Sequence, residues 1–502
     1  MLSSKTETQT RGERGEGREG FKEEMSLDPP KGAGCELRSG DTAKIVGSVA
    51  CFASFLVYGA CQGALGAALP SLSAAFGLSE GNFGIVYSLR GLGYLVGTLG
   101  SAALLEFKSV KFVVSTEVLV CVSVVSTGLA TGLVVAAAGP GDYSAVLFLF
   151  FFQGLGFGGI DTLANCVLPE IWGQRVQPWM QAMHSFFGVG AVIGPALVGG
   201  FGFRVAFVVL ALSSGVPLAG LLSQASLRSS PPLPLHEDKD KDKVEVEVEA
   251  NTTEETEQCR HEVVAAQPED GPVPPDVALV AAEPATRAPQ LPLPALSVRL
   301  LLALFFFVYV GVECAFGAWI STYSLRTGVT ASEEDAAFVA SIYWAALTVG
   351  RVVAIPLAIN FSTTSMLRAQ LFLAVIGAVL TATIADRSYS LVCAVSAVFG
   401  YALSSIFPLA MTMVLDYGFF MDGPTTSLFV VGATFGEGVV PACLGLAMDL
   451  GPEALPYCTC AGTFVVIVLY ITTHKLLLLA TKRNEYEYRL PQQIEDTSVR
   501  SK

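Results

Sequence analysis

Twelve apolar segments, each long enough to cross a bilayer, make up most of this chain. A transmembrane helix needs about 20 mainly apolar residues. Six such segments precede an acidic stretch and six follow it, at residues 43–69, 83–105, 111–136, 144–168, 180–200, 204–224, 298–321, 336–359, 366–385, 390–415, 427–446 and 454–474. The pattern predicts an all-α membrane protein with two groups of six transmembrane helices.

The composition argues against a soluble globular protein. Of the 502 residues 52% are hydrophobic and only 15% are charged, whereas the surface of a soluble protein of this length needs more charge. The formal net charge of -14 is largely local, because fifteen acidic and six basic residues fall between Arg228 and Arg287. This argues against nucleic acid as a partner. The eleven cysteines and four histidines lack metal-ligand spacing, so no metal site and no cofactor are predicted beyond a coupling ion.

Three polar segments are expected outside the membrane. Residues 1–42 lack an apolar core and predict a disordered tail. Residues 225–297 predict a solvated, acidic, proline-rich linker between bundles at 43–224 and 298–475, and residues 476–502 predict a C-terminal tail. Lysine and arginine are more frequent in the short loops on the side of the membrane that holds both termini. Such loops are usually cytoplasmic, so the tails and the linker are expected in the cytoplasm. We expect a monomer in the plasma membrane whose linker could dock a cytoplasmic partner.

Ionisable residues inside the apolar segments are the functional candidates, because a charge in hydrocarbon costs several kcal/mol unless it faces a polar cavity or a partner. The string FFQGLGFGGIDTLAN contains Asp161 and Asn165. Four residues apart in a helix, they share one face. We predict that both bind solute and that Asp161 is a candidate for binding a coupling ion.

Glu313 lies in the string FVYVGVECAFGAWIS, with Tyr309 and Phe316 on the same side of the helix by spacing. Rings and a carboxylate suit a hydroxylated solute, because sugar C–H faces stack on rings while hydroxyls donate to carboxylate oxygens. We predict solute contacts for all three residues, and ion coupling for Glu313. The alternative is a polar group that only packs helices together.

Glu437 lies four residues before Pro441. A proline in a membrane helix frees a backbone carbonyl, so this helix is expected to kink beside its own acid. Glu437 is the third candidate for binding sodium or a proton.

Three further residues are assigned to gating or structure. His184 and Gln181 are three residues apart; a histidine can relay protons, but a hydrogen-bonded structural role is favoured because the polar segment 170–181 supplies partners. Arg351 either pairs with an intramembrane acid or extends to the cytoplasmic interface. Arg90 and Glu117 are expected to be paired within the first group of helices.

Six strings carry a family resemblance, and they occur in family order: LPSLSAAFGLSEGNFGIVYSLRGLGYLVGT, GLGFGGIDTLAN, WMQAMHSFFGVGAVIGP, YVGVECAFGAWI, YWAALTVGRVVAIPLA and GATFGEGVVPACLG. At these residues the sequence resembles the major facilitator superfamily. More narrowly, it resembles the branch that contains the sodium-dependent glucose transporter-like proteins and, more distantly, the bacterial fucose permeases.

The resemblance implies two pseudo-symmetric six-helix bundles around a central cavity that opens alternately to each side. It further implies secondary transport of a hexose or similar polyol, with sodium or proton coupling or none. By position it assigns Asp161 and Asn165 to solute contact and Glu313 and Trp319 to the signature of the seventh helix, where Trp319 is also expected to contact solute. Gln62 stands in the region of the first helix where the permeases carry an acid, and it is a further candidate for solute contact.

Two other functions remain open. One is a transport-inactive membrane receptor or scaffold that docks partners through the acidic linker; the retained intramembrane acids argue against it. The other is transport of a non-sugar amphiphile through an apolar lateral opening. An enzyme is not predicted, because no nucleophile–base pair appears in the sequence.

Overall fold

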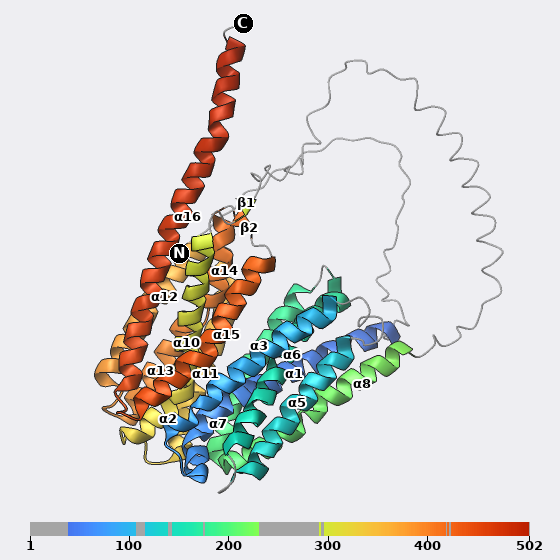
Figure 1. Cartoon of the computed structure of the whole chain (residues 1–502), viewed down its shortest axis with the longest axis vertical. Coiled ribbons are helices and arrows are strands. Elements are labelled where there is room, and N and C mark those ends of the chain that lie inside the picture. Colours follow the sequence, from blue (N-terminus) through green and yellow to red (C-terminus); the bar gives the residue numbers. More distant parts are fainter. Residues whose placement is uncertain are drawn as a thin grey trace, which may run out of the picture. The chain divides into compact units, whose positions relative to one another are not determined.

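The computed structural model describes residues 39–106, 116–138, 143–173, 176–229, 291–292, 296–417, 419–420 and 423–500. The helices of the first half, residues 39–229, are α1 Ser39–Phe76, α2 Glu80–Phe83, α3 Ile85–Glu106, α5 Thr116–Ala137, α6 Tyr143–Trp172, α7 Gln177–Ser213 and α8 Gly215–Ser229. The helices of the second half, residues 296–500, are α10 Leu296–Arg326, α11 Glu333–Asn360, α12 Thr363–Ile384, α13 Tyr389–Leu403, α14 Ile406–Asp416, α15 Gly423–Met448 and α16 Ala454–Arg500 (Figure 1). Two short strands, β1 Leu291–Pro292 and β2 Phe419–Phe420, pair in parallel.

Ten stretches of the described residues are long and apolar enough to cross a membrane. One of them, Pro178–Gln224, is 47 residues long, and Gly202 interrupts it with φ 74°, a conformation that glycine adopts without strain. This stretch therefore supplies two traverses. The remaining predicted traverse is α3, which is less apolar because its buried face carries Tyr87, Arg90 and Tyr94. All twelve predicted traverses thus correspond to helices within the described ranges.

Several helix boundaries differ from the prediction. The segment predicted as one helix over 390–415 is divided into α13 and α14, with Ser404 and Ser405 between them. The last helix continues to Arg500 where a tail was expected, and its apolar part ends at Lys482 (Figure 1). The helix predicted over 111–136 is described from Thr116 onward, as α5. Residues 1–38 of the predicted tail and residues 230–290 of the predicted linker lie outside the described residues.

Small residues let the helices of each half pack backbone to backbone. In the first half the most extensive contacts join α1 with α7 and α3 with α6. A Cβ atom added at Gly154 would lie 1.9 Å from the carbonyl oxygen of Arg90, so only glycine allows α3 and α6 to approach this closely. In the second half α10 packs mainly on α15. Tight packing of this kind holds the polar side chains of α3, α6, α10 and α15 at defined positions.

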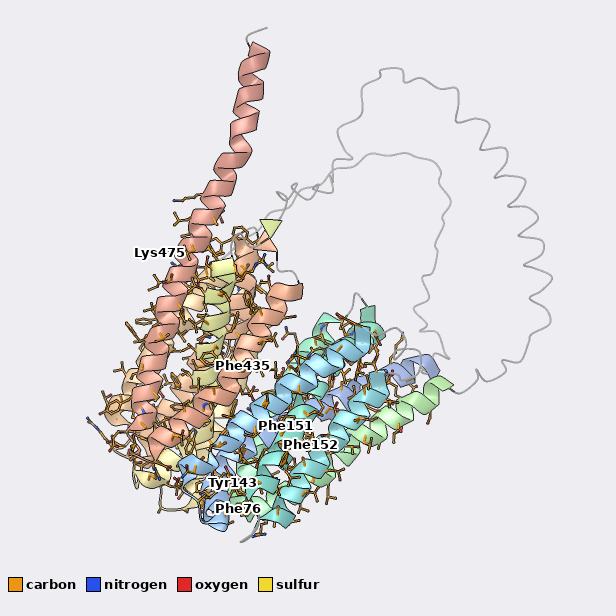
Figure 2. The ribbon with its side chains drawn as sticks, in the orientation of Figure 1. Phe76, Tyr143, Phe151, Phe152, Phe435 and Lys475 are labelled. Atoms are coloured by element: carbon orange, nitrogen blue, oxygen red, sulfur yellow. The ribbon has the colours of Figure 1, made fainter. Side chains whose placement is uncertain are left out.

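The two halves contact each other through α7 with α11, α3 with α15 and α1 with α10. Several polar contacts join them at the end of the helices marked by Phe76, which we call the Phe76 end. There Glu80 pairs with Arg326, and Ser71 donates to Glu333. At the same end Phe76 and Tyr143 lie together, with ring centroids 6.2 Å apart (Figure 2).

Candidate functional site

The predicted pair on α6 forms the first part of the site. Asn165 Nδ2 donates to Asp161 Oδ1 at 3.2 Å and to the Asp161 carbonyl at 2.7 Å. The hydroxyl of Tyr94, on α3, donates to Asp161 Oδ2. Asp161 and Asn165 therefore share one face of α6, as their spacing predicts. Tyr94 supplies a third polar group.

Gln62 and Glu437 form the second part of the site, across the two halves. Gln62 Nε2 on α1 donates to Glu437 Oε1 on α15 at 2.8 Å. The charge of Arg90, on α3, acts on Glu437, and the charges of Asp161 and Glu313 also reach it. Glu437 is therefore electrostatically connected with the other two predicted acids, near the middle of its own helix.

Tyr58 connects these two parts. It is buried on α1, and its ring packs on Phe157 with centroids 4.5 Å apart. The charges of Glu437, Asp161 and Arg90 all act on its hydroxyl. An aromatic wall thus lies beside two carboxylates, an amide and a guanidinium. We call the set Tyr58, Gln62, Arg90, Tyr94, Asp161, Asn165 and Glu437 the central cluster.

Glu313 lies in a separate polar group inside the second half. Arg351 Nη2 on α11 is 3.4 Å from Glu313 Oε1, and the hydroxyl of Tyr309 also donates to this carboxylate. Of the two alternatives for Arg351, the structure therefore shows pairing with an intramembrane acid. Glu313 is buried, so the pair compensates a charge that would otherwise be costly there.

Carbonyl groups at the break between α13 and α14 accept hydrogen bonds from the polar group around Glu313. Arg351 Nε donates to the Ser404 carbonyl at 3.1 Å, and the Tyr309 hydroxyl, whose single hydrogen is shared with Glu313, lies 2.8 Å from the Leu403 carbonyl. The interruption of the helix leaves these carbonyls available to side chains of neighbouring helices. Glu313, Arg351 and Tyr309 thereby join α10 and α11 to the break.

The aromatic residues predicted on α10 are fully buried. Phe316 packs between Tyr343 and Phe399, with ring centroids 5.0 and 4.8 Å away. Trp319 is 0% exposed, and its Nε1 donates to the Pro441 carbonyl at 2.8 Å. This carbonyl belongs to α15. Their contacts link α10 with its neighbours, and a role for Tyr309, Phe316 or Trp319 in solute contact stays a prediction.

His184 and Gln181 lie near the beginning of α7. Both are exposed, and the ring of His184 stands edge-on to Phe55 with centroids 5.2 Å apart. The charges of Asp161 and Arg351 reach His184 from the two halves. The Gln181 carbonyl accepts from Ser185. A role of His184 and Gln181 in gating stays a prediction.

Helix α3 contributes side chains to this region that were not predicted as site residues. Tyr87, Arg90 and Tyr94 recur at spacings of three and four residues, which is the spacing of one helix face. The guanidinium carbon of Arg90 lies 5.2 Å from the ring centre of Tyr87 and 5.8 Å from that of Phe157. Arg90 had been expected to pair within the first half, whereas its charge acts on Glu437 in the second. The polar spacing was visible in the sequence, but the partner helix was not.

Known proteins resemble this chain over most of its length. A family model described as Major Facilitator Superfamily matches residues 50–441. The sodium-dependent glucose transporter 1 of Xenopus laevis is 26% identical over 415 residues, which is 81% of this chain and 77% of that protein. The sodium-dependent glucose transporter 1A of Mus musculus is 24% identical over 447 residues, covering 86% of this chain and 97% of that protein.

A solved structure shares the fold. A crystal structure of a mutant of the nucleoside transporter NupG superposes with a TM-score of 0.58 and 10% sequence identity, covering 86% of this chain and 99% of that one. The similarity confirms the predicted all-helical, multi-pass membrane fold. The chain belongs to the major facilitator superfamily, and it is accordingly a membrane transporter of small solutes and not an enzyme.

Proposed function

We propose that this protein is a secondary transporter of a hexose or a similar small polyhydroxylated solute. The central cluster supports the proposal, since carboxylates and amides accept hydrogen bonds from hydroxyls while tyrosine rings pack against sugar C–H faces. Two relatives that match most of the chain are named as sodium-dependent glucose transporters. The solute class rests on these two arguments together.

The single observation that carries the proposal is the hydrogen bond between Gln62 and Glu437, at 2.8 Å across the two halves. A solute that competes for these groups would contact both halves at once. Its binding would then favour one arrangement of the halves over another, which is what alternating access requires. We assign solute contact to Asp161, Asn165, Gln62 and Glu437.

We assign Tyr309, Phe316 and Trp319 to positioning α10. Each is at most 1% exposed, and Tyr309 and Trp319 already donate within the second half. A buried group whose hydrogen-bonding capacity is met gains little from a solute. Glu313 and Arg351 belong to the same supporting structure.

For ion coupling, by sodium or a proton, Asp161 and Glu437 are the stronger candidates. The guanidinium of Arg351 already compensates the charge of Glu313. Within the described ranges, the hydrogen bonds to Asp161 Oδ2 and Oδ1 come from a hydroxyl and an amide, which are neutral. A coupling ion would supply the missing positive charge.

The expected orientation, with both termini in the cytoplasm of a cell bounded by the plasma membrane, makes the Phe76 end extracellular. The contacts of Glu80 with Arg326 and of Ser71 with Glu333 then close the extracellular side. A monomer is sufficient for this mechanism, because both halves belong to one chain. Docking of a cytoplasmic partner on the acidic linker is a prediction that concerns residues outside those described.

The test is uptake of radiolabelled hexoses by proteoliposomes that contain the purified protein. An imposed sodium gradient, an imposed proton gradient and no gradient are compared. Accumulation that follows one gradient identifies the coupling ion, and equilibration without accumulation identifies facilitation. No uptake of any hexose or polyol under the three conditions would contradict the proposal and favour a receptor or an amphiphile transporter.

A further inference from the structure

Among the buried polar atoms of the described residues that lack a hydrogen-bond partner, three belong to α1 and α3 at or beside the central cluster. They are Nη1 of Arg90, Oε1 of Gln62 and the hydroxyl of Tyr87. The three residues are only 3%, 8% and 3% exposed. Because a buried polar atom without a partner costs stability, such groups are rare and call for an explanation.

The three groups are linked to one another through Glu437 and Arg90. Gln62 uses its Nε2 to donate to Glu437, which leaves Oε1 as the free atom of the same amide. The charge of Arg90 acts on Glu437 and on Tyr87, and the guanidinium lies 5.2 Å from the Tyr87 ring centre. The unpartnered atoms therefore belong to one neighbourhood and not to three unrelated defects.

A close approach of two helices brings α3 and α15 together at this point. A Cβ atom added at Gly91 would lie 2.8 Å from the Cα of Gly438. These glycines directly follow Arg90 and Glu437 in the sequence. The Ser88 hydroxyl also donates to the Gly438 carbonyl, at 3.1 Å. The unpartnered groups thus belong to the first half, beside the place where α3 meets α15 of the second half.

We propose that Arg90, Tyr87 and Gln62 bind a vicinal diol of the solute, which supplies the hydrogen bonds that the protein lacks. This inference rests on the proposed function and names the part of the solute that is recognised. Arg90 is a donor only, the Tyr87 hydroxyl can donate, and Gln62 Oε1 is an acceptor. Hydroxyl groups both donate and accept, so two neighbouring hydroxyls can satisfy all three atoms.

A neutral diol fits this neighbourhood better than an anion. The charges of two carboxylates, Asp161 and Glu437, act on Tyr58 beside the single guanidinium of Arg90. A carboxylate or phosphate on the solute would be attracted by one charge and repelled by two. The subsite therefore selects a neutral polyol and disfavours sugar acids.

Tyr87→Phe is the sharpest variant for testing this subsite. It removes a hydroxyl that has no hydrogen-bond partner among the described residues, so it breaks no hydrogen bond in that part of the chain. Tyr470→Phe is the matched control, because Tyr470 on α16 also carries a buried hydroxyl with no hydrogen-bond partner in the described part of the chain. Any difference between the two variants then reports on the solute and not on folding.

The experiment measures KM for D-glucose, for its monodeoxy derivatives and for gluconate in proteoliposomes. We expect Tyr87→Phe to raise KM for the intact hexose about tenfold or more, since a site built to bind a hydroxyl discriminates strongly against its loss. One monodeoxy derivative should already be poor for the wild-type protein and should lose no further affinity in Tyr87→Phe. Arg90→Gln should act in the same direction, and Tyr470→Phe should stay within twofold of the wild type.

Two outcomes would overturn the inference while leaving the proposed function intact. One is a wild-type protein that transports hexose with a KM unchanged by Tyr87→Phe. The other is a preference for gluconate over glucose. A wild-type protein that takes up no polyol would instead overturn the proposed function, and the inference with it.

Discussion

Arg326, at the end of α10, pairs with Glu80, at the start of α2, with Nε 2.8 Å from Oε2. The pair joins the two halves at the Phe76 end. Asp449 reinforces it, because its carboxylate lies 3.9 Å from Arg326 Nη2 and accepts from the Gly81 amide at 3.0 Å. Contacts that exist only while this end is closed must bias the equilibrium between closed and open arrangements.

Arg326→Gln should shift this equilibrium toward an arrangement open at the Phe76 end. The side chains of the pair are 31% and 19% exposed. We therefore expect the closed arrangement to lose about 0.2–1 kcal/mol of stability, which changes the ratio of closed to open protein by up to about fivefold. Spin labels at the exposed positions Ala74 and Asp386 report the separation of the halves. Arg387→Gln, an exposed arginine at the same end, is the control, and equal distance distributions for both variants would contradict the prediction.

Acidic pH should favour closure of the Phe76 end. Burial raises the pKa of Glu80 above its ordinary value of 4.5, although the charge of Arg326 acts in the opposite direction. The closed arrangement therefore holds the proton more tightly than an open one, in which Glu80 is solvated. This proton binding stabilises the closed arrangement relative to the open one. The stabilisation is complete below pH 4.5 and is lost as the pH rises through the raised pKa of Glu80. The same spin labels should show this shift, and Glu80→Gln should remove it; a shift that persists in Glu80→Gln belongs to another group.

Asp161→Asn should abolish or uncouple transport while leaving the folded protein abundant. The substitution keeps the size of the side chain but removes the negative charge that faces Tyr94 and Asn165. We expect a loss of at least about tenfold in uptake, because intramembrane charges are usually functional. Asp386→Asn, an exposed position, is the control. Uptake at the wild-type level would remove Asp161 from the mechanism.

Glu437→Gln separates coupling from solute binding. A glutamine amide at this position can still form a hydrogen bond with Gln62, but it cannot take up a proton or compensate the charge of a sodium ion. If Glu437 binds the ion, gradient-driven accumulation should fall to the equilibrium level while exchange of labelled for unlabelled solute continues. Retained accumulation with impaired exchange would instead assign Glu437 to the solute.

Arg351→Gln should destabilise the second half by leaving Glu313 buried without its partner. Removing one partner of a fully buried ion pair lowers the free energy of unfolding by about 3–5 kcal/mol. We expect a smaller decrease of about 1–3 kcal/mol for Arg351→Gln, because the Arg351 side chain is one-third exposed. Thermal unfolding in detergent measures the loss. The double variant Glu313→Gln with Arg351→Gln should recover most of it, and additive losses would show that the pair is not coupled.

Much of the fold follows from local patterns. The lengths of the apolar runs predicted the traverses, and the predicted boundary at residues 200–204 contains Gly202, where the long helix changes direction. The spacing of Asp161 and Asn165 placed them on one helix face, and their side chains are hydrogen-bonded. These relations depend on residues within a few positions of one another, so helix geometry alone specifies them.

Relations between distant segments could not be obtained in this way. Gln62 and Glu437 are 375 residues apart, and the sequence left open whether Arg351 would pair with an acid or extend to the interface. The polar face of α3 was likewise overlooked, because Tyr94 meets Asp161 on α6 and the charge of Arg90 acts on Glu437 on α15. A membrane helix is apolar on nearly every side, so its sequence does not reveal which face meets a neighbour. That choice is made by close packing at small residues and by hydrogen bonds between helices, which exist only once the two halves have assembled.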